Sequence, residues 1–299
     1  MKKKISVLFV LLFSVISQMF GANYQSDFNK YFKNKDFVNQ LKTLKSWEKS
    51  SPKDAELYTC YFNYYYARSQ EEVLSLTVDK PDGEALIIGD STGKVAGYIG
   101  SQTTTDKSNF KMCIRKIDEG IALFPNRLDM RFGKIYALGQ VKDWEDFTSE
   151  IIKAIKYSKD NNNNWTWTNN EIKEEGKEFF LSSLQDYQLQ LYNTEDDKLL
   201  TNMRDIAIAV LEVYPNHIES LSNLSITYMV SKNYDKAIEV LLRAESLNPK
   251  DGIVLMNLAH GYKMKGDKVK SILYYEKAIE FVDDSSKEYS KKQIIELKK

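Results

Sequence analysis

The side chains that most often carry out acid–base or nucleophilic chemistry are few in this chain and widely spaced. Its two histidines, His217 and His260, lie 43 residues apart, and the sequence contains no H-E-x-x-H or C-x-x-C motif. A lone histidine without a partner constellation is usually structural. We therefore expect no catalytic residue, no metal site and no cofactor, although two carboxylates from distant segments could still share a cleft, as glycosidases require.

Cys60 and Cys113 are the only cysteines, and each lies in an apolar context with helical periodicity. They could form a single disulfide in an oxidising compartment or remain buried free thiols. The sequence leaves both alternatives open, but the absence of a C-x-x-C spacing argues against a redox role.

Aromatic residues in two places suggest contact with a sugar or a peptide. Trp165 and Trp167 flank Thr166 in an asparagine-rich loop at about 159–170, and a dense tyrosine cluster runs from Tyr58 to Tyr66. An exposed indole face could stack on a sugar ring while amides bond its hydroxyls. The alternative is that both tryptophans fold back as anchors of the loop and that the tyrosine stripe is packed core.

One stretch, at about 76–105, interrupts the helical periodicity. Two runs typical of strands, Glu84–Ile88 and Lys94–Ile99, flank the turn-rich segment Gly89–Gly93. This segment lacks the Lys-Ser/Thr ending of a phosphate-binding loop, which argues against a nucleotide site. We predict a small β-hairpin insertion around residues 84–99.

The first residues predict export. Lys2, Lys3 and Lys4 precede the mostly apolar run Ile5–Ile16, and small residues follow, with cleavage expected after Gly21 or Ala22. That run is shorter than a membrane-spanning helix, although an uncleaved anchor is the alternative. We expect a periplasmic or secreted protein of a Gram-negative bacterium, with no integral membrane span after cleavage of residues 1–22.

Charge argues against a nucleic-acid partner. Without its three signal lysines the chain has 39 basic and 42 acidic residues, a balance that gives no bulk attraction for polyanions.

The elements that must position these residues are helices, and near the C-terminal end they repeat. A helix predicted at Ala55–Ser69 shows the same apolar periodicity as its neighbours, and prolines at 52, 125 and 215 separate successive helix pairs. At a spacing of 34 residues, Leu224, Tyr228, Ile238 and Ala244 recur as Leu258, Tyr262, Ile272 and Ala278. This period indicates a helix–turn–helix unit that stacks on copies of itself.

These residues resemble the tetratricopeptide repeat (TPR) family. Its small residues at positions 8, 20 and 27 correspond to Ser225, Ala237 and Ala244, and then to Ala259, Ser271 and Ala278. The resemblance covers 218–285 well and implies an all-α, right-handed helix–turn–helix solenoid. We expect a signal peptide at 1–22, a divergent TPR-like region at 23–215, two clear repeats at 216–285 and a capping helix at 286–299.

The resemblance also implies a non-enzymatic scaffold that binds a protein or peptide on a concave groove. The groove candidates come from the first helix of each clear repeat: Ile226, Met229, Val230, Met256, His260, Lys263 and Met264. A covering of these residues by the N-terminal half is an equal alternative. The other two hypotheses are a glycan-binding or glycan-acting envelope protein, which would use Trp165, Trp167 and the Tyr58–Tyr66 cluster, and an oligomeric structural component.

Overall fold

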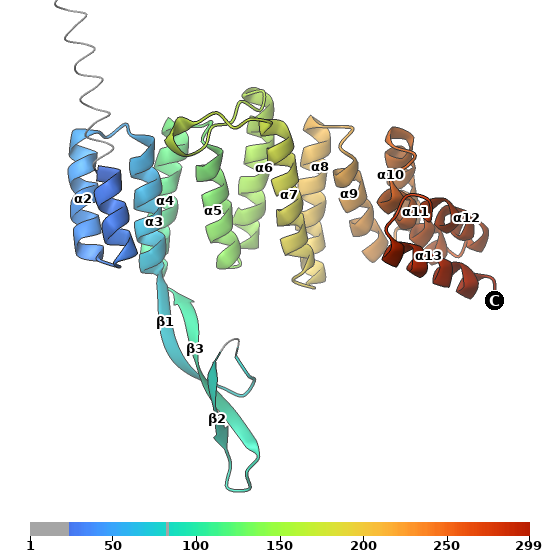
Figure 1. Cartoon of the computed structure of the whole chain (residues 1–299), viewed down its shortest axis with the longest axis horizontal. Coiled ribbons are helices and arrows are strands. Elements are labelled where there is room, and N and C mark those ends of the chain that lie inside the picture. Colours follow the sequence, from blue (N-terminus) through green and yellow to red (C-terminus); the bar gives the residue numbers. More distant parts are fainter. Residues whose placement is uncertain (1–23, 82–83) are drawn as a thin grey trace, which may run out of the picture. The chain divides into compact units, whose positions relative to one another are not determined.

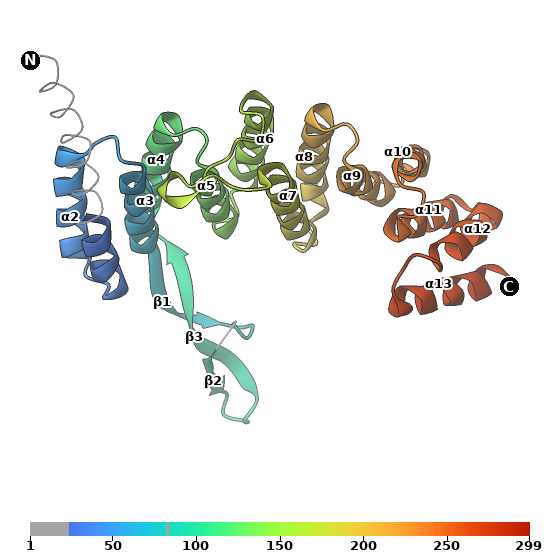
Figure 2. The same ribbon diagram turned by 45° about the horizontal axis from the view of Figure 1, so that its top comes forward.

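The computed structural model describes residues 24–81 and 84–299 of the chain. The predicted signal peptide at 1–22 therefore lies outside the described residues. Apart from one small sheet, the regular elements are helices that follow one another in helix–turn–helix order (Figures 1 and 2), which confirms the predicted fold class. None of the helices in the described part is long and apolar enough to cross a membrane.

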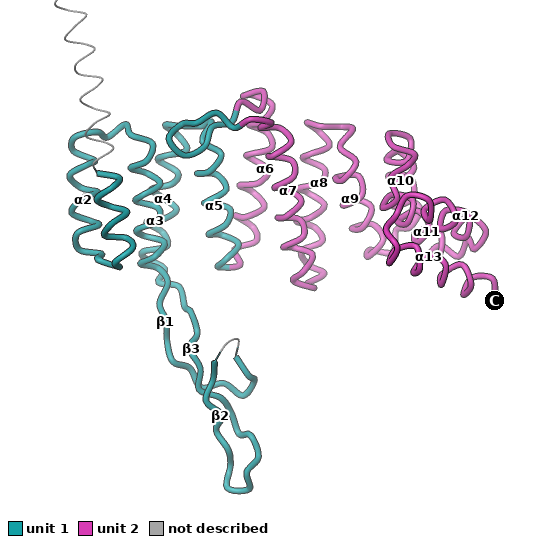
Figure 3. The backbone as a smooth tube through the Cα atoms, viewed as in Figure 1, with its two compact units in different colours: residues 1–141, 165–173 teal, residues 142–164, 174–299 magenta. Residues whose placement is uncertain are grey.

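Contacts divide the chain into two compact units, which Figure 3 shows in different colours. The first comprises residues 1–141 and 165–173, and the second comprises residues 142–164 and 174–299. The division predicted at residue 216, between divergent helices and clear repeats, lies inside the second unit.

The first unit is a set of helices with the sheet inserted between α3 and α4. Its described elements are a helix at 24–33, α2 (Phe37–Ser50), α3 (Ala55–Ser69), β1 (Gln70–Thr77), β2 (Ala85–Gly89), β3 (Val95–Thr105), α4 (Lys107–Leu123), α5 (Leu128–Gln140) and the 3-10 helix η1 (Thr168–Asn170).

The second unit is helical throughout its described elements. They are α6 (Trp144–Asp160), α7 (Gly176–Tyr192), the 3-10 helix η2 (Asp197–Leu199), α8 (Leu200–Val213), α9 (Ile218–Val230), α10 (Tyr234–Leu247), α11 (Gly252–Lys265), α12 (Lys268–Ala278) and α13 (Asp284–Leu297).

A recurring turn starts several of the helices. Ahead of α2, α10 and α12, a residue with positive φ is followed by an Asp or Asn N-cap whose side chain accepts a backbone N–H in the first helical turn. The backbone N–H of the cap donates to a tyrosine carbonyl five residues earlier, as in the 2.9 Å bond from Asp36 to Tyr31. The same bond joins Asn233 to Tyr228 and Asp267 to Tyr262. A short polar turn thus reverses the chain both in the clear repeats and near the N-terminus.

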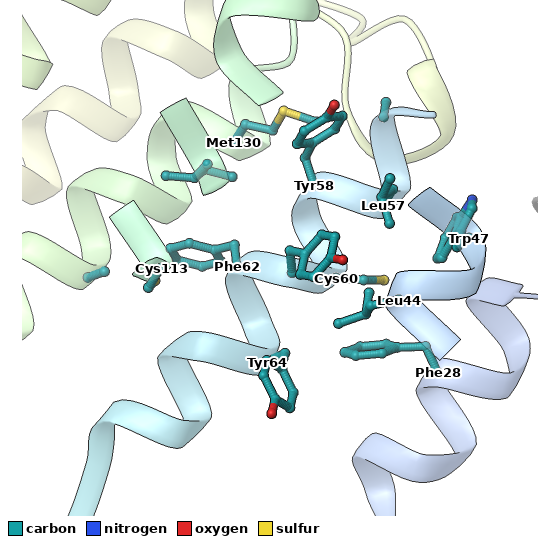
Figure 4. Close-up of a cluster of buried hydrophobic side chains, with 14 residues drawn as sticks. Phe28, Leu44, Trp47, Leu57, Tyr58, Cys60, Phe62, Tyr64, Cys113 and Met130 are labelled. Carbon is teal, nitrogen blue, oxygen red and sulfur yellow. The ribbon is translucent and has the colours of Figure 1, made fainter. Parts of the chain in front are cut away.

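The core of the first unit is built around α3 (Figure 4). Tyr58 and Phe62, which Figure 4 labels, are buried there together with Tyr61, so this part of the predicted tyrosine stripe is core. Tyr65 and Tyr66 are half-buried and pack against the same core. Cys60 and Cys113 belong to the same core as buried free thiols. Burial raises the pKa of both thiols well above the usual value, so they remain protonated and chemically inert at neutral pH.

The core of the second unit follows the repeat pattern. The small residues expected at the helix contacts are all essentially inaccessible to solvent: Ser225, Ala237, Ala244, Ala259, Ser271 and Ala278. Ser271 Oγ donates a 2.8 Å hydrogen bond to the carbonyl of Ala259, so α12 and α11 approach closely at their two small positions. Leucines and tyrosines on either side of these contacts fill the remaining space.

The insertion is a three-stranded antiparallel sheet with the order β1-β3-β2. The predicted hairpin corresponds to β2 and β3, whose turn is closed by Asp90 Oδ1 accepting from Thr92 N at 2.7 Å and from Lys94 N at 3.0 Å. The sequence prediction of two strands missed β1, which continues directly from α3 and pairs with β3 over its whole length. Residues 74–77 alternate between apolar and polar side chains, but this period-2 signal is short, and the strand follows α3 without an intervening turn.

Candidate functional site

The predicted groove residues lie on α9 and α11, the first helices of the two clear repeats. Ile226 and Met229 of α9 and Met256 of α11 are half-buried, whereas Val230 is 41% exposed and Met264 is 46% exposed. Ile253, also on α11, is 69% exposed. These side chains form a mostly apolar surface beside the core stripe of the same two helices.

Helix packing explains how this surface is held. The buried stripe of α11 includes Leu255, Leu258 and Ala259. Met256 and His260 follow two of these residues directly and therefore lie at the edge of the core. Gly261 lets α9 and α10 approach α11: a Cβ there would lie 3.2 Å from Ile238 Cγ1 and 3.8 Å from Met229 Cε. Met229 thus contributes both to the core and to the surface.

Two polar side chains of α11, His260 and Lys263, lie beside the apolar residues. Lys263 Nζ donates a hydrogen bond to Gln293 Oε1 of α13 and lies 4.0 Å from Glu296 Oε2. Desolvation by the surrounding helices, followed by the positive charge of Lys263, lowers the pKa of His260. At neutral pH this histidine is therefore an uncharged donor and acceptor, and Lys263 is the cationic group of the surface.

Comparison with known families identifies the repeat that carries this surface. Residues 218–251 match the family model described as tetratricopeptide repeat. The segment at 218–251 is thus a tetratricopeptide repeat. No curated protein matches the chain.

Several solved TPR structures are similar to this chain. The TPR domain of Sgt2 from Aspergillus fumigatus is 24% identical over 38% of this chain and 79% of its own, with a TM-score of 0.32. YrrB, described as a TPR protein with an unusual peptide-binding site, is 13% identical over 83% of this chain and 97% of its own, with a TM-score of 0.41. A thermophilic TPR protein of Thermus thermophilus, TTC0263, is 14% identical over 63% of this chain and 92% of its own, with a TM-score of 0.39.

The tryptophan loop is not the exposed platform that a sugar site would need. Trp165 is fully buried, so its ring offers no face to a ligand. Trp167 is half-buried, with its ring 6.3 Å from that of Phe132 and the Lys173 ammonium 5.6 Å from its centroid. The proposal that Trp165 and Trp167 bind a glycan together is corrected accordingly, because the first ring serves as an anchor of the loop.

His217 forms a local cluster whose composition resembles a hydrolase triad. Its Nδ1 lies 2.9 Å from Ser220 Oγ and its Nε2 lies 3.2 Å from Glu219 Oε2. Ser220, however, is only 1% exposed, so its hydroxyl cannot reach a substrate. Burial lowers the pKa of His217, which favours a neutral ring bonded to the first turn of α9. This cluster is therefore best explained as structural.

Sequence reasoning also missed a motif that the structure explains. Gly89-Asp90-Ser91-Thr92-Gly93 has the G-x-S-x-G spacing of a nucleophile elbow. That elbow requires a strand followed by a helix, whereas these residues form the exposed turn between β2 and β3. The hydroxyl of Ser91 therefore lacks the setting that activates a serine nucleophile in those enzymes.

The helices of the second unit enclose a groove and a smaller hollow. An open groove of about 730 Å³ runs between α6 and α8, and its lining includes Trp144, Lys153, Lys156, Lys198 and Asn202. Asn202 Nδ2 donates to Thr148 Oγ1 at 2.8 Å and to the Trp144 carbonyl at 3.1 Å, so it joins the two helices. A smaller hollow of about 330 Å³ lies between α7 and the segment before α9. No cluster of three or more metal-ligating side chains occurs among the described residues.

Proposed function

We propose that this protein is an exported, non-enzymatic scaffold that binds an apolar peptide segment of a partner along α9 and α11. TPR proteins are scaffolds for protein and peptide binding, so the matched repeat supports a binding function in general terms. The observation that supports the finer proposal is the apolar surface on α9 and α11, on which Ile226, Met229, Val230, Met256 and Met264 all retain exposed area.

The chemistry of that surface favours a peptide over a small molecule. Its methionines are unbranched and adapt to different side chains, as on other surfaces that accept varied apolar segments. His260 and Lys263 lie on α11 beside these apolar residues, and both can donate hydrogen bonds to peptide carbonyls. Apolar side chains on the first helices of two successive repeats suit an extended or helical segment that contacts both repeats.

Introducing negative charges on α9 and α11 tests this proposal. Peptides would be selected from a displayed random library on the purified protein, and their affinities measured by calorimetry for the wild type and for Val230→Glu/Met264→Glu. We expect the double variant to bind at least about tenfold more weakly, because two carboxylates replace apolar contact area. Both positions are exposed at 41% and 46%, so the fold should tolerate the change.

The matched control makes the same change on the second helices of the repeats. Leu242 on α10 is 40% exposed and Val269 on α12 is 79% exposed. Leu242→Glu/Val269→Glu should bind the selected peptides with affinities within about twofold of the wild-type values. The proposed binding surface would be contradicted if both double variants lost affinity equally, or if Val230→Glu/Met264→Glu lost none.

Export rests on the amino-terminal sequence and has its own test. When the full-length gene is expressed in a Gram-negative host, we expect a mature protein in the periplasmic or secreted fraction that begins at Ala22 or Asn23. Leu11→Arg/Leu12→Arg should abolish this processing, because it interrupts the apolar run. Edman sequencing of both fractions decides the question, and an unprocessed cytoplasmic wild type that retains Lys2–Lys4 would refute export.

A further inference from the structure

The β-sheet insertion presents an apolar face that the helical repeats do not need. Leu76 on β1, Ile99 on β3 and Leu86 on β2 lie directly opposite one another, so they form one row across the three strands. Leu74 and Ile88 lie two residues further along their strands and therefore share this face. We call these five residues the leucine face.

The leucine face is exposed to solvent. Leu74 is 81% exposed, Leu76 is 71% exposed and Leu86 is 72% exposed, while Ile99 is 37% exposed. Together these side chains present on the order of 300 Å² of apolar surface, which is in the range of the largest apolar patch on a typical monomer, a patch that is often functional. Packing of the sheet itself does not require them, since an outward face of an antiparallel sheet is normally polar.

The opposite face of the sheet is partly covered by its own crossover connection. A Cβ at Gly100, which pairs with Ser75 and Ala85 on that face, would lie 2.6 Å from Pro81 Cγ. Pro81 thus covers part of this face near Gly100, although Ile87 on the same face remains 65% exposed. In Figures 1 and 2 the sheet extends away from the ends of α3 and α4.

Charge indicates which kind of molecule that is. Residues 70–105 contain six acidic and only two basic side chains. Glu72 lies on the leucine face next to Leu74, and Glu84 immediately precedes β2; both are exposed. An acidic rim repels an anionic lipid surface and also repels the same rim on a second copy of the sheet. It attracts a partner whose apolar side chains are flanked by Lys or Arg.

We propose that the leucine face docks an amphipathic helix of a partner protein, apolar on one side and rich in Lys or Arg along its flanks. Three neighbouring strands span about 10 Å, which matches the width of a single α-helix. Packing a helix on this sheet would complete the two-layer arrangement that an apolar sheet face requires. This site is independent of the groove on α9 and α11.

A pair of synthetic helices tests the proposal on the full protein. The probe is a labelled 18-residue amphipathic peptide with leucines on one side and lysines on the other, and its twin carries glutamates instead of lysines. By fluorescence anisotropy at low salt, we expect saturable binding of the lysine peptide only, weakening as salt screens the attraction. Leu76→Glu/Leu86→Glu should weaken binding at least about tenfold. The added carboxylates would by themselves attract lysines, so this loss would report the apolar contact.

Matched variants separate the leucine face from other surfaces. Ile87, on the opposite face of β2, is 65% exposed, and Ile87→Glu should leave the affinity within about twofold. The variant Val230→Glu/Met264→Glu should bind the lysine peptide with wild-type affinity. The two proposed sites can therefore fail independently of each other. Circular dichroism checks folding, and Leu76→Thr/Leu86→Thr provides a strand-compatible second variant that should also bind more weakly.

Four outcomes would overturn the proposal. They are no saturable binding up to about 1 mM peptide, equal binding of the lysine and glutamate peptides, a dimer in light scattering that Leu76→Glu/Leu86→Glu converts to a monomer, and leucine-dependent binding to vesicles of anionic phospholipid. The third result would assign the leucine face to a second copy of the chain, and the fourth would assign it to a membrane.

Discussion

Replacement of Arg127 by methionine is expected to lower the free energy of unfolding by about 3–5 kcal/mol, because it leaves buried carboxylates without their cation. Arg127 is only 1% exposed. Its Nη1 donates to Glu56 Oε1 at 2.7 Å, and its Nε and Nη2 donate to the two carboxylate oxygens of Asp129 at 2.8 and 2.7 Å. The paired Asp129 contacts match the fork of a guanidinium, so even Arg127→Lys should lose part of the stability.

The same network holds a loop in place. Glu56 Oε1 also accepts a 2.7 Å hydrogen bond from the backbone N–H of Asn169, and Asn170 Oδ1 accepts from Arg127 Nη1 at 3.4 Å. In Arg127→Met we therefore expect faster amide hydrogen exchange in residues 165–173. This local change would come in addition to the lower free energy of unfolding, which urea denaturation measures.

A surface ion pair provides the control for Arg127. Lys287 Nζ lies 3.3 Å from Asp284 Oδ1, whose side chain is fully exposed. Lys287→Ala should change the free energy of unfolding by less than about 1 kcal/mol, because exposed pairs contribute little. A loss below about 1 kcal/mol in Arg127→Met would contradict the structural role assigned to the network.

The parts of the fold that follow local rules could be predicted from the sequence. The predicted helix at Ala55–Ser69 has the bounds of α3, because an Asp54 cap begins it and its apolar side chains recur at helical spacing. The small residues of the clear repeats are buried as expected, since their spacing directly reflects the contacts between helices. The recurring turn, such as Lys35-Asp36 and Lys232-Asn233, is a further local signal that links divergent helices to the clear repeats.

Features that depend on distant residues could not be predicted in this way. Glu56 and Arg127 are 71 residues apart, and their buried ion pair has no local signature. Strand β1 was missed because its alternation in polarity is short and no turn separates it from α3. Its pairing with β3 depends on a segment that follows it by some 25 residues, as for Ser75 and Gly100. The apolar face on the sheet, which is the basis of one proposal, emerges only from that register.

The tryptophan loop shows how composition misleads when burial is unknown. Asparagines and two tryptophans in a long loop suggested a ligand platform, but backbone bonds draw the loop onto the first unit. The N–H of Thr166 donates to the carbonyl of Asn126 at 2.9 Å, and the N–H of Lys173 donates to the carbonyl of Trp165 at 2.9 Å. The Arg131 guanidinium lies over the Trp165 ring, 5.9 Å from its centroid.

Trp165→Ala is therefore expected to cost about 3–5 kcal/mol of unfolding free energy, since it removes a large, fully buried ring and leaves a cavity. Trp167→Ala is the matched control in the same loop. Its half-buried ring should contribute nearer 1 kcal/mol. Chemical denaturation of both variants measures the difference. Equal and small losses would show that the Trp165 ring is not the anchor, and would reopen the possibility that this loop offers its aromatic faces to a ligand.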